Sequence, residues 1–224
     1  MSYYVTLEAG KESKKHYENF PVATLLYPKK IREAAIILYN FARTGDNIAD
    51  EGNFPKKVRI KKLQIFKENL IKINNNNLNV EPLFQDISKI IKLYEIPISL
   101  FQRFIVAFKQ DVIINRYKTF DEITNYTHNA ASPAGEMILG LFKQNSKRNV
   151  SYSNSICKAL ALIGITQDFY EDIKKNRLYI PTNEMKKYKL KISDIHKKEF
   201  NNNWKLFKDF WLNRIELILI DGLP

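Results

Sequence analysis

The sequence has one cysteine, few glycines and prolines, and no long apolar run. Cys157 alone permits no intramolecular disulfide and no cysteine-rich metal site. Seven Gly and eight Pro in 224 residues are too few for an all-β chain with many tight turns. The apolar stretch 215–220 is interrupted by Glu216 and is shorter than the ~20 residues that span a bilayer. The N-terminus lacks the apolar core of a signal peptide. These absences predict a cytoplasmic protein.

The positive charge is large but spread along the whole chain. Lys and Arg total 36 against 24 Asp and Glu, and only eight of the 36 are arginine. We interpret the scattered lysines as a solvated surface and expect no nucleic-acid partner. A weak attraction to anionic lipid headgroups stays open, which would add peripheral contact with the inner face of the membrane. The 45% apolar content is typical of a globular protein.

Apolar residues recur at helical spacing in every long segment. Four predicted helices begin at or near prolines, at positions 28, 55, 82 and 97. Thr119 and Glu122 form a capping box that opens another helix, which Pro133 should kink or break. Further helices are expected over 151–176, from Thr182 onward, and over 200–220. Because no alternating strand pattern is present, we predict an all-α fold with one domain over residues 1–224.

Two pairs of aspartates stand out by their spacing. Asp46 and Asp50 are four residues apart at the end of an apolar helix, and so are Asp168 and Asp172. Residues four apart on a helix share a face at ~6 Å, so two like charges there need cations nearby. One such pair is common on a solvated helix face. Two pairs facing each other across a bundle would supply oxygen ligands for Mg²⁺.

Basic and phenolic residues flank both acidic pairs. Arg43 lies three residues before Asp46, and Arg177 follows Asp172 with Tyr179 close behind. Guanidinium groups bind phosphate oxygens bidentately, and a Tyr hydroxyl can donate to a leaving diphosphate. A simple ion pair of Arg177 with Glu171 or Asp172 is the alternative.

Several stretches together resemble the squalene/phytoene synthase family. HYENFPVA at 16–23 and LYNFARTGDNIADEG at 38–52 look most like its hydroxysqualene synthase branch, which serves hopanoid synthesis. Three further matches follow in order, at 107–122, 126–135 and 167–181, and Pro133 favours this branch over the phytoene synthases. The matched region runs from residue 16 to residue 181.

The resemblance implies an all-α isoprenoid synthase fold with a central apolar cavity capped by two aspartate-rich motifs. Asp46 and Asp50 would form the first motif, and Asp168 and Asp172 the second, binding a prenyl diphosphate through Mg²⁺. Tyr39 and Tyr126 match positions near the reacting carbons in the family, although core packing is their alternative role. The residues expected to hold the diphosphate are Arg43, Gln167, Arg177 and Tyr179.

The implied activity is Mg²⁺-dependent conversion of presqualene diphosphate to hydroxysqualene and diphosphate, alongside other hopanoid-pathway enzymes. Head-to-head condensation of prenyl diphosphates is the enzymatic alternative. The alternative of another class is a protein without activity. It would be either a non-catalytic relative, such as a respiratory complex I assembly factor, or a decayed, truncated enzyme. Asn47, Ala161 and Gly164 depart from the usual family motifs, in which Asp, Gln and Asn are common.

The C-terminal end of the sequence raises one more expectation. The chain stops at Pro224, where the family usually continues with helices that help wall the cavity. We therefore expect an exposed apolar patch on the helix at 200–220, suited to self-association or membrane contact.

Overall fold

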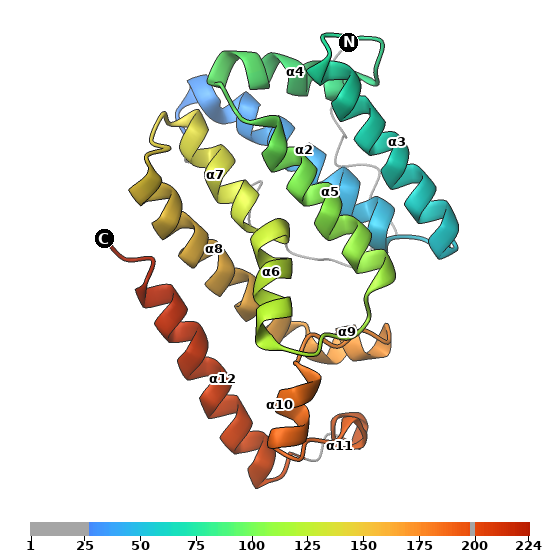
Figure 1. Ribbon diagram of the computed structural model, residues 1–224, viewed down its shortest axis with the longest axis vertical. Coiled ribbons are helices and arrows are strands. Elements are labelled where there is room, and N and C mark those ends of the chain that lie inside the picture. The colour runs from blue at the N-terminus through green and yellow to red at the C-terminus, as the bar shows by residue number, and fades with distance from the viewer. Residues whose placement is uncertain (1–26, 198–199) are drawn as a thin grey trace.

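Helices make up the computed structural model, which describes residues 27–197 and 200–224 (Figure 1). The motif at residues 16–23 therefore lies outside the described residues. Within them no named strand occurs, and only an isolated bridge joins Arg116 and Leu178. The predicted all-α fold is confirmed. The helices are α2 Lys29–Asp50, α3 Lys56–Asn74, α4 Pro82–Tyr94, α5 Ile98–Ile113, α6 Phe120–Ala130, α7 Ser132–Leu141, α8 Lys147–Gln167, α9 Phe169–Lys174, α10 Thr182–Lys187, α11 Ile192–Lys197 and α12 Asn202–Ile220.

The helix starts follow the predicted signals. Prolines precede α2, α3 and α5 and occupy the first position of α4, where a missing N–H costs nothing. The Thr119 hydroxyl caps α6 by accepting from the Glu122 N–H at 3.3 Å. The Glu122 carboxylate accepts from the N–H of Lys118 at 2.6 Å, one residue before the cap, so the capping box is present in a shifted form.

Two breaks shape the middle of the chain, and only one was predicted. α6 ends and α7 begins on either side of Ala131, two residues before Pro133, as expected. The helix expected over 151–176 is instead divided at Asp168 into α8 and α9. Asp168 has φ −87° and ψ 3°, outside regular helix geometry. The Asp172 N–H still bonds to the Asp168 carbonyl at 2.9 Å, which keeps the two aspartates one turn apart.

Two adjoining apolar clusters hold the helices together. The first cluster joins α2, α3, α4, α5 and part of α7 around the fully buried Phe41. The Phe41 ring lies 4.9 Å from the ring of Phe66 and 5.0 Å from that of Phe101. The second joins α6, α8 and the segments from α9 to α12. In Figure 1 α7, α8 and α12 lie side by side, and α9 to α11 gather at one end of them.

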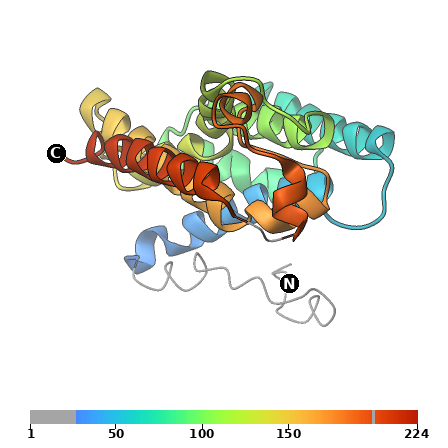
Figure 2. The ribbon, with the colours of Figure 1, turned by 90° about the horizontal axis from the view of Figure 1, so that it is seen from below.

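α12 buries one apolar face. Trp204, Phe207, Trp211 and Ile215 are buried at helical spacing because the helix packs along α8 (Figure 2). The side chains of Leu206, Leu212, Leu217, Ile220 and Leu223 are exposed, and the expected apolar patch on this helix stays a prediction. None of the helices built from the described residues combines the length and apolarity needed to cross a bilayer.

Candidate functional site

An extended segment over 177–181 brings the second acidic motif to the rest of the site. Its backbone is tied to residues 115–118, since the Leu178 N–H donates to the Asn115 carbonyl at 3.0 Å and the Thr182 N–H to the Tyr117 carbonyl at 2.9 Å. Side chains alternate along extended backbone. Arg177 and Tyr179 therefore share one side of the segment, and Ile180 points to the other.

Asp50 and Arg177 join the two motifs. The guanidinium donates twice to the Asp50 carboxylate, which also lies 3.3 Å from the Lys175 ammonium. Arg177 and Asp50 expose only 14% and 21% of their side chains. Burial alone would raise the pKa of Asp50, but the bonds and charges of Arg177 and Lys175 outweigh it and lower that pKa. The alternative ion pair of Arg177 with Glu171 or Asp172 is not formed, and Glu171 pairs with Lys174.

Asp111 on α5 extends this network. An Arg177 N–H donates to the Tyr179 hydroxyl at 3.4 Å, and that hydroxyl donates to the Asp111 carboxylate at 3.3 Å. Burial raises the pKa of Asp111 to about 7, and the like charge of Asp50 adds to the rise. A hydrogen bond from Tyr126 and the charge of Arg177 act in the opposite direction.

Three tyrosines surround the Asp111 carboxylate. The ring of Tyr179 lies 5.7 Å from Tyr117 and 5.4 Å from Tyr126. Burial, with the nearby charge of Asp111, raises the pKa of all three phenols, so each stays a neutral donor at physiological pH. Asp111 and Tyr117 were not predicted as site residues. The available signal was an aspartate one turn beyond Phe108 on the apolar face of α5.

Asp172 belongs to the same electrostatic group. The pKa of this half-buried carboxyl is raised to about 6, because burial and the charges of Asp168 and Asp50 outweigh the lowering by Arg177 and Lys175. Each motif therefore acts on the charge state of the other.

The other predicted residues lie on α2 and at the break between α8 and α9. Arg43 pairs with Asp46 at 3.2 Å on a partly exposed stretch of α2, and Tyr39 is half-buried one turn earlier. Gln167 and Asp168 are exposed at the break between α8 and α9. The structure thus brings Asp50, Asp172, Arg177, Tyr179 and Tyr126 together.

The donor set fits a hard divalent cation that also binds phosphate. Across the described ranges no three His, Cys, Asp or Glu side chains lie close enough to hold a metal ion by themselves. Mg²⁺ does not require such a cage, because it commonly takes one or two carboxylates and completes its shell with water and substrate phosphates. Asp46, Asp50, Asp168 and Asp172 are the carboxylates that would hold it.

The departures at the second motif leave room near the site. A methyl group added at Gly164 would meet nothing within 4 Å, and the half-buried Ala161 lies one turn earlier on α8. A Cβ atom at position 164 would therefore be accommodated without overlap.

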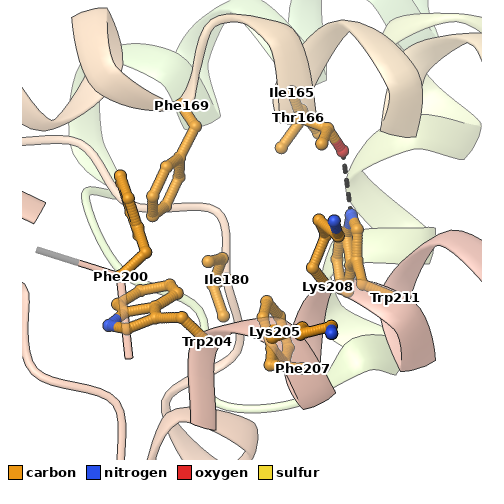
Figure 3. A pocket seen from close by; sticks show the side chains of 10 residues that line it. All are labelled: Ile165, Thr166, Phe169, Ile180, Phe200, Trp204, Lys205, Phe207, Lys208 and Trp211. Atoms are coloured by element: carbon orange, nitrogen blue, oxygen red, sulfur yellow. Dashed lines mark hydrogen bonds between the residues drawn. The ribbon is translucent and has the colours of Figure 1, made fainter. Parts of the chain in front are cut away.

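An apolar cavity of about 410 Å³ lies between α12 and the junction of α8 with α9 (Figure 3). None of the ten predicted site residues lines it. This cavity is therefore not the one expected to be capped by the aspartates. That expected cavity stays a prediction. Its lining consists of Ile165, Thr166, Phe169, Ile180, Phe200, Trp204, Lys205, Phe207, Lys208 and Trp211.

Comparison with known proteins identifies relatives of this chain. The chain is 32% identical over 170 residues to hydroxysqualene synthase of Zymomonas mobilis, covering 75% of this chain and 56% of that protein. It is 26% identical over 190 residues to the hydroxysqualene synthase of Rhodopseudomonas palustris, covering 84% and 63%. The chain thus spans less than two thirds of the length of these relatives.

A solved structure shares the arrangement of helices. The crystal structure of squalene synthase HpnC from Alicyclobacillus acidocaldarius superimposes with a TM-score of 0.84 at 25% identity, covering 92% of this chain and 77% of that one. A family model described as squalene/phytoene synthase matches residues 13–223. With nearly its whole length matched, the chain belongs to the squalene/phytoene synthase family.

Proposed function

We propose that this protein is a prenyl diphosphate enzyme that converts presqualene diphosphate to hydroxysqualene and diphosphate. The observation that carries the proposal is the Asp50–Arg177 pair, which unites the two acidic motifs beside Asp111 and Tyr179. The similarity to two hydroxysqualene synthases supports this product over others.

The first chemical step is ionisation of the carbon–oxygen bond. The electron pair leaves with the diphosphate, and a carbocation remains on the lipid. Arg177, Lys175 and Arg43 place three positive charges beside the carboxylates, where they would stabilise the departing diphosphate. Mg²⁺, held by Asp46, Asp50, Asp168 and Asp172, would supply further positive charge to the same oxygens.

The neutral phenols contribute a different function. The raised pKa of Tyr179 and Tyr126 keeps both hydroxyls protonated and neutral. In this structure both phenols bond to Asp111, so either one would donate to a diphosphate oxygen only by exchanging that bond for the substrate. The carbocation rearranges with opening of its three-membered ring, and water then adds to it and loses a proton to solvent, which gives the open-chain alcohol.

The test is incubation of the purified chain with presqualene diphosphate and Mg²⁺, followed by mass spectrometry of the lipid. Hydroxysqualene with an equivalent of diphosphate is the expected outcome. Squalene or phytoene from C15 or C20 diphosphates would support a head-to-head transferase instead.

A non-catalytic relative is the second candidate. Gly164 and Ala161 favour it, since the usual Asn and Gln of the second motif are absent, and so does Asp50, which is already engaged by Arg177. A folded protein that binds diphosphate without turnover would support this candidate. Gly164→Asn tests it directly, because it restores the residue that is usual in the second motif at a position where a Cβ meets no atom within 4 Å, and a weakened enzyme should then gain turnover.

A further inference from the structure

The cavity beside α12 is built almost entirely from apolar side chains. Aromatic rings supply much of its wall: Trp204, Phe207 and Trp211 come from α12, and Phe169 comes from α9 (Figure 3). Its volume of about 410 Å³ is within the range of sites for small organic ligands.

The uncharged polar side-chain atoms of the lining are already satisfied. The Trp211 indole N–H donates to the Thr166 hydroxyl at 2.8 Å, and that hydroxyl donates to the Leu162 carbonyl at 2.7 Å. The Trp204 indole N–H donates to Asp194 at 3.2 Å. The part of a ligand that enters this cavity must therefore be apolar, because a buried polar group would find no partner.

Among the described residues of the lining, two lysines carry the charge. Lys205 and Lys208 lie three residues apart on α12 and are exposed. Neither has a salt bridge to a carboxylate in the part of the chain that the structure describes. An ammonium group at the edge of an apolar cavity complements a ligand with an apolar chain and an anionic head.

The cavity is separate from the acidic site. Tyr179 bonds to Asp111 on one side of the extended segment, whereas its neighbour Ile180 lines the cavity on the other side. Thr166 and Phe169 line it, while the motif residues Gln167 and Asp168 between them do not.

We propose that this cavity is a binding site for a single-chain anionic amphiphile, with the chain among the aromatic rings and the head on Lys205 and Lys208. The class includes free fatty acids and prenyl monophosphates, which share this chemistry. The inference concerns a second site and does not depend on the proposed activity.

The chain contains its own reporter for this site. It has two tryptophans, and both line the cavity. A bromine atom quenches indole fluorescence on contact, so 9,10-dibromostearate, kept below its aggregation concentration, should quench the emission saturably. Farnesyl monophosphate should displace the dibromostearate, which would show that the site also takes prenyl monophosphates. If it does not displace the dibromostearate, the site is limited to fatty acids and the proposed class of ligands is overturned.

Variants test each half of the site. Lys205→Gln with Lys208→Gln should weaken dibromostearate binding by roughly threefold to tenfold, because two charge contacts at an exposed rim are lost. The matched control is Lys67→Gln with Lys72→Gln on the distant helix α3, which removes the same charge and should change nothing (Figure 1). Ile165→Phe should abolish saturable quenching by filling the cavity, with circular dichroism to confirm the fold.

Four results would overturn the proposal, and three of them concern the free amphiphile. They are an absence of quenching in the wild type, equal quenching by the neutral dibromostearyl alcohol, and quenching that the rim lysines do not affect. Quenching only by vesicles of brominated phospholipid would also overturn it, since that result identifies a membrane surface instead of a free amphiphile. Because the readout is binding, its failure is distinguishable from a failure of catalysis.

Discussion

At the scale of single residues, Asp50 has the most connected carboxylate of the site. It accepts from Arg177 and Lys175, both over 120 residues away in sequence, and its pKa is lowered by them against the effect of burial. Such a pair contributes to stability only as long as both partners remain, because each would otherwise be left partly buried and unpaired.

We expect Asp50→Asn to lower the free energy of unfolding by about 1–3 kcal/mol, reduced from the fully buried case because both side chains keep some exposure. Urea denaturation measures it. The control is Asp86→Asn, whose pair with Lys89 is exposed and whose loss should cost less than about 0.5 kcal/mol. Equal effects of the two substitutions would mean that the Asp50–Arg177 pair is no stronger than a surface pair.

Asp168→Asn is the kinetic counterpart at the second motif. If this exposed carboxylate holds the metal at the step that ionises the substrate, turnover should fall by several orders of magnitude with the fold unchanged. Steady-state diphosphate release measures it. A loss of about tenfold or less would show that Asp168 is not a ligand.

At the scale of helices, α7 and α8 cross where a glycine allows close approach. A methyl group at Gly135 would lie 2.3 Å from the Ser153 hydroxyl and 2.6 Å from the Cys157 sulfur, whereas one at Gly164 meets nothing. Gly135→Ala should therefore destabilise the protein by about 1–3 kcal/mol through overpacking. Gly164→Ala should stabilise it by about 0.5–1 kcal/mol through helix propensity. Thermal unfolding of the two variants compares them, and the same sign for both would contradict this account of the crossing.

The junction of α5, α6 and α7 predicts a pH effect. The His128 Nδ1 lies 3.1 Å from Arg103, which also pairs with Glu136 at 2.6 Å. Burial and the charge of Arg103 lower the pKa of His128. Smaller contributions come from Glu136, which raises that pKa, and from Lys158, which lowers it. Because the folded pKa is below the unfolded value of about 6.5, the stability from the neutral ring is present above that pH and lost as the pH falls below it.

His128→Asn keeps an acceptor for Arg103 but cannot be protonated. Between pH 7.5 and 5.5 the melting temperature of the wild type should therefore fall further than that of the variant. Parallel pH profiles would show that the ring and Arg103 are not coupled.

At the same scale, local signals account for most helices but not for the break at Asp168. Prolines and the Thr119 cap lie within the segments that they end or begin, so the sequence alone reveals them. No Pro or Gly stands at the break in 167–169. The following segment 177–183 is instead held by backbone hydrogen bonds to residues 115–118. Such tertiary ties have no local signature.

At the scale of the whole molecule, the site exists because distant segments meet. The spacing of Asp46 with Asp50 and of Asp168 with Asp172 predicted the two motifs, and Asp50 and Asp172 do influence each other. Asp111 could not be assigned from sequence, because one aspartate near the end of an apolar helix is ordinary until Tyr179, 68 residues later, is placed against it.

The central claim is that both motifs form one diphosphate site, and calorimetric titration with inorganic diphosphate and Mg²⁺ tests it most directly. Asp50→Asn and Asp172→Asn should each weaken binding by at least tenfold, and the double variant should lose less than the product of the two effects, because residues of one site are not additive. Binding that only one motif affects, or losses that multiply independently, would contradict a shared site.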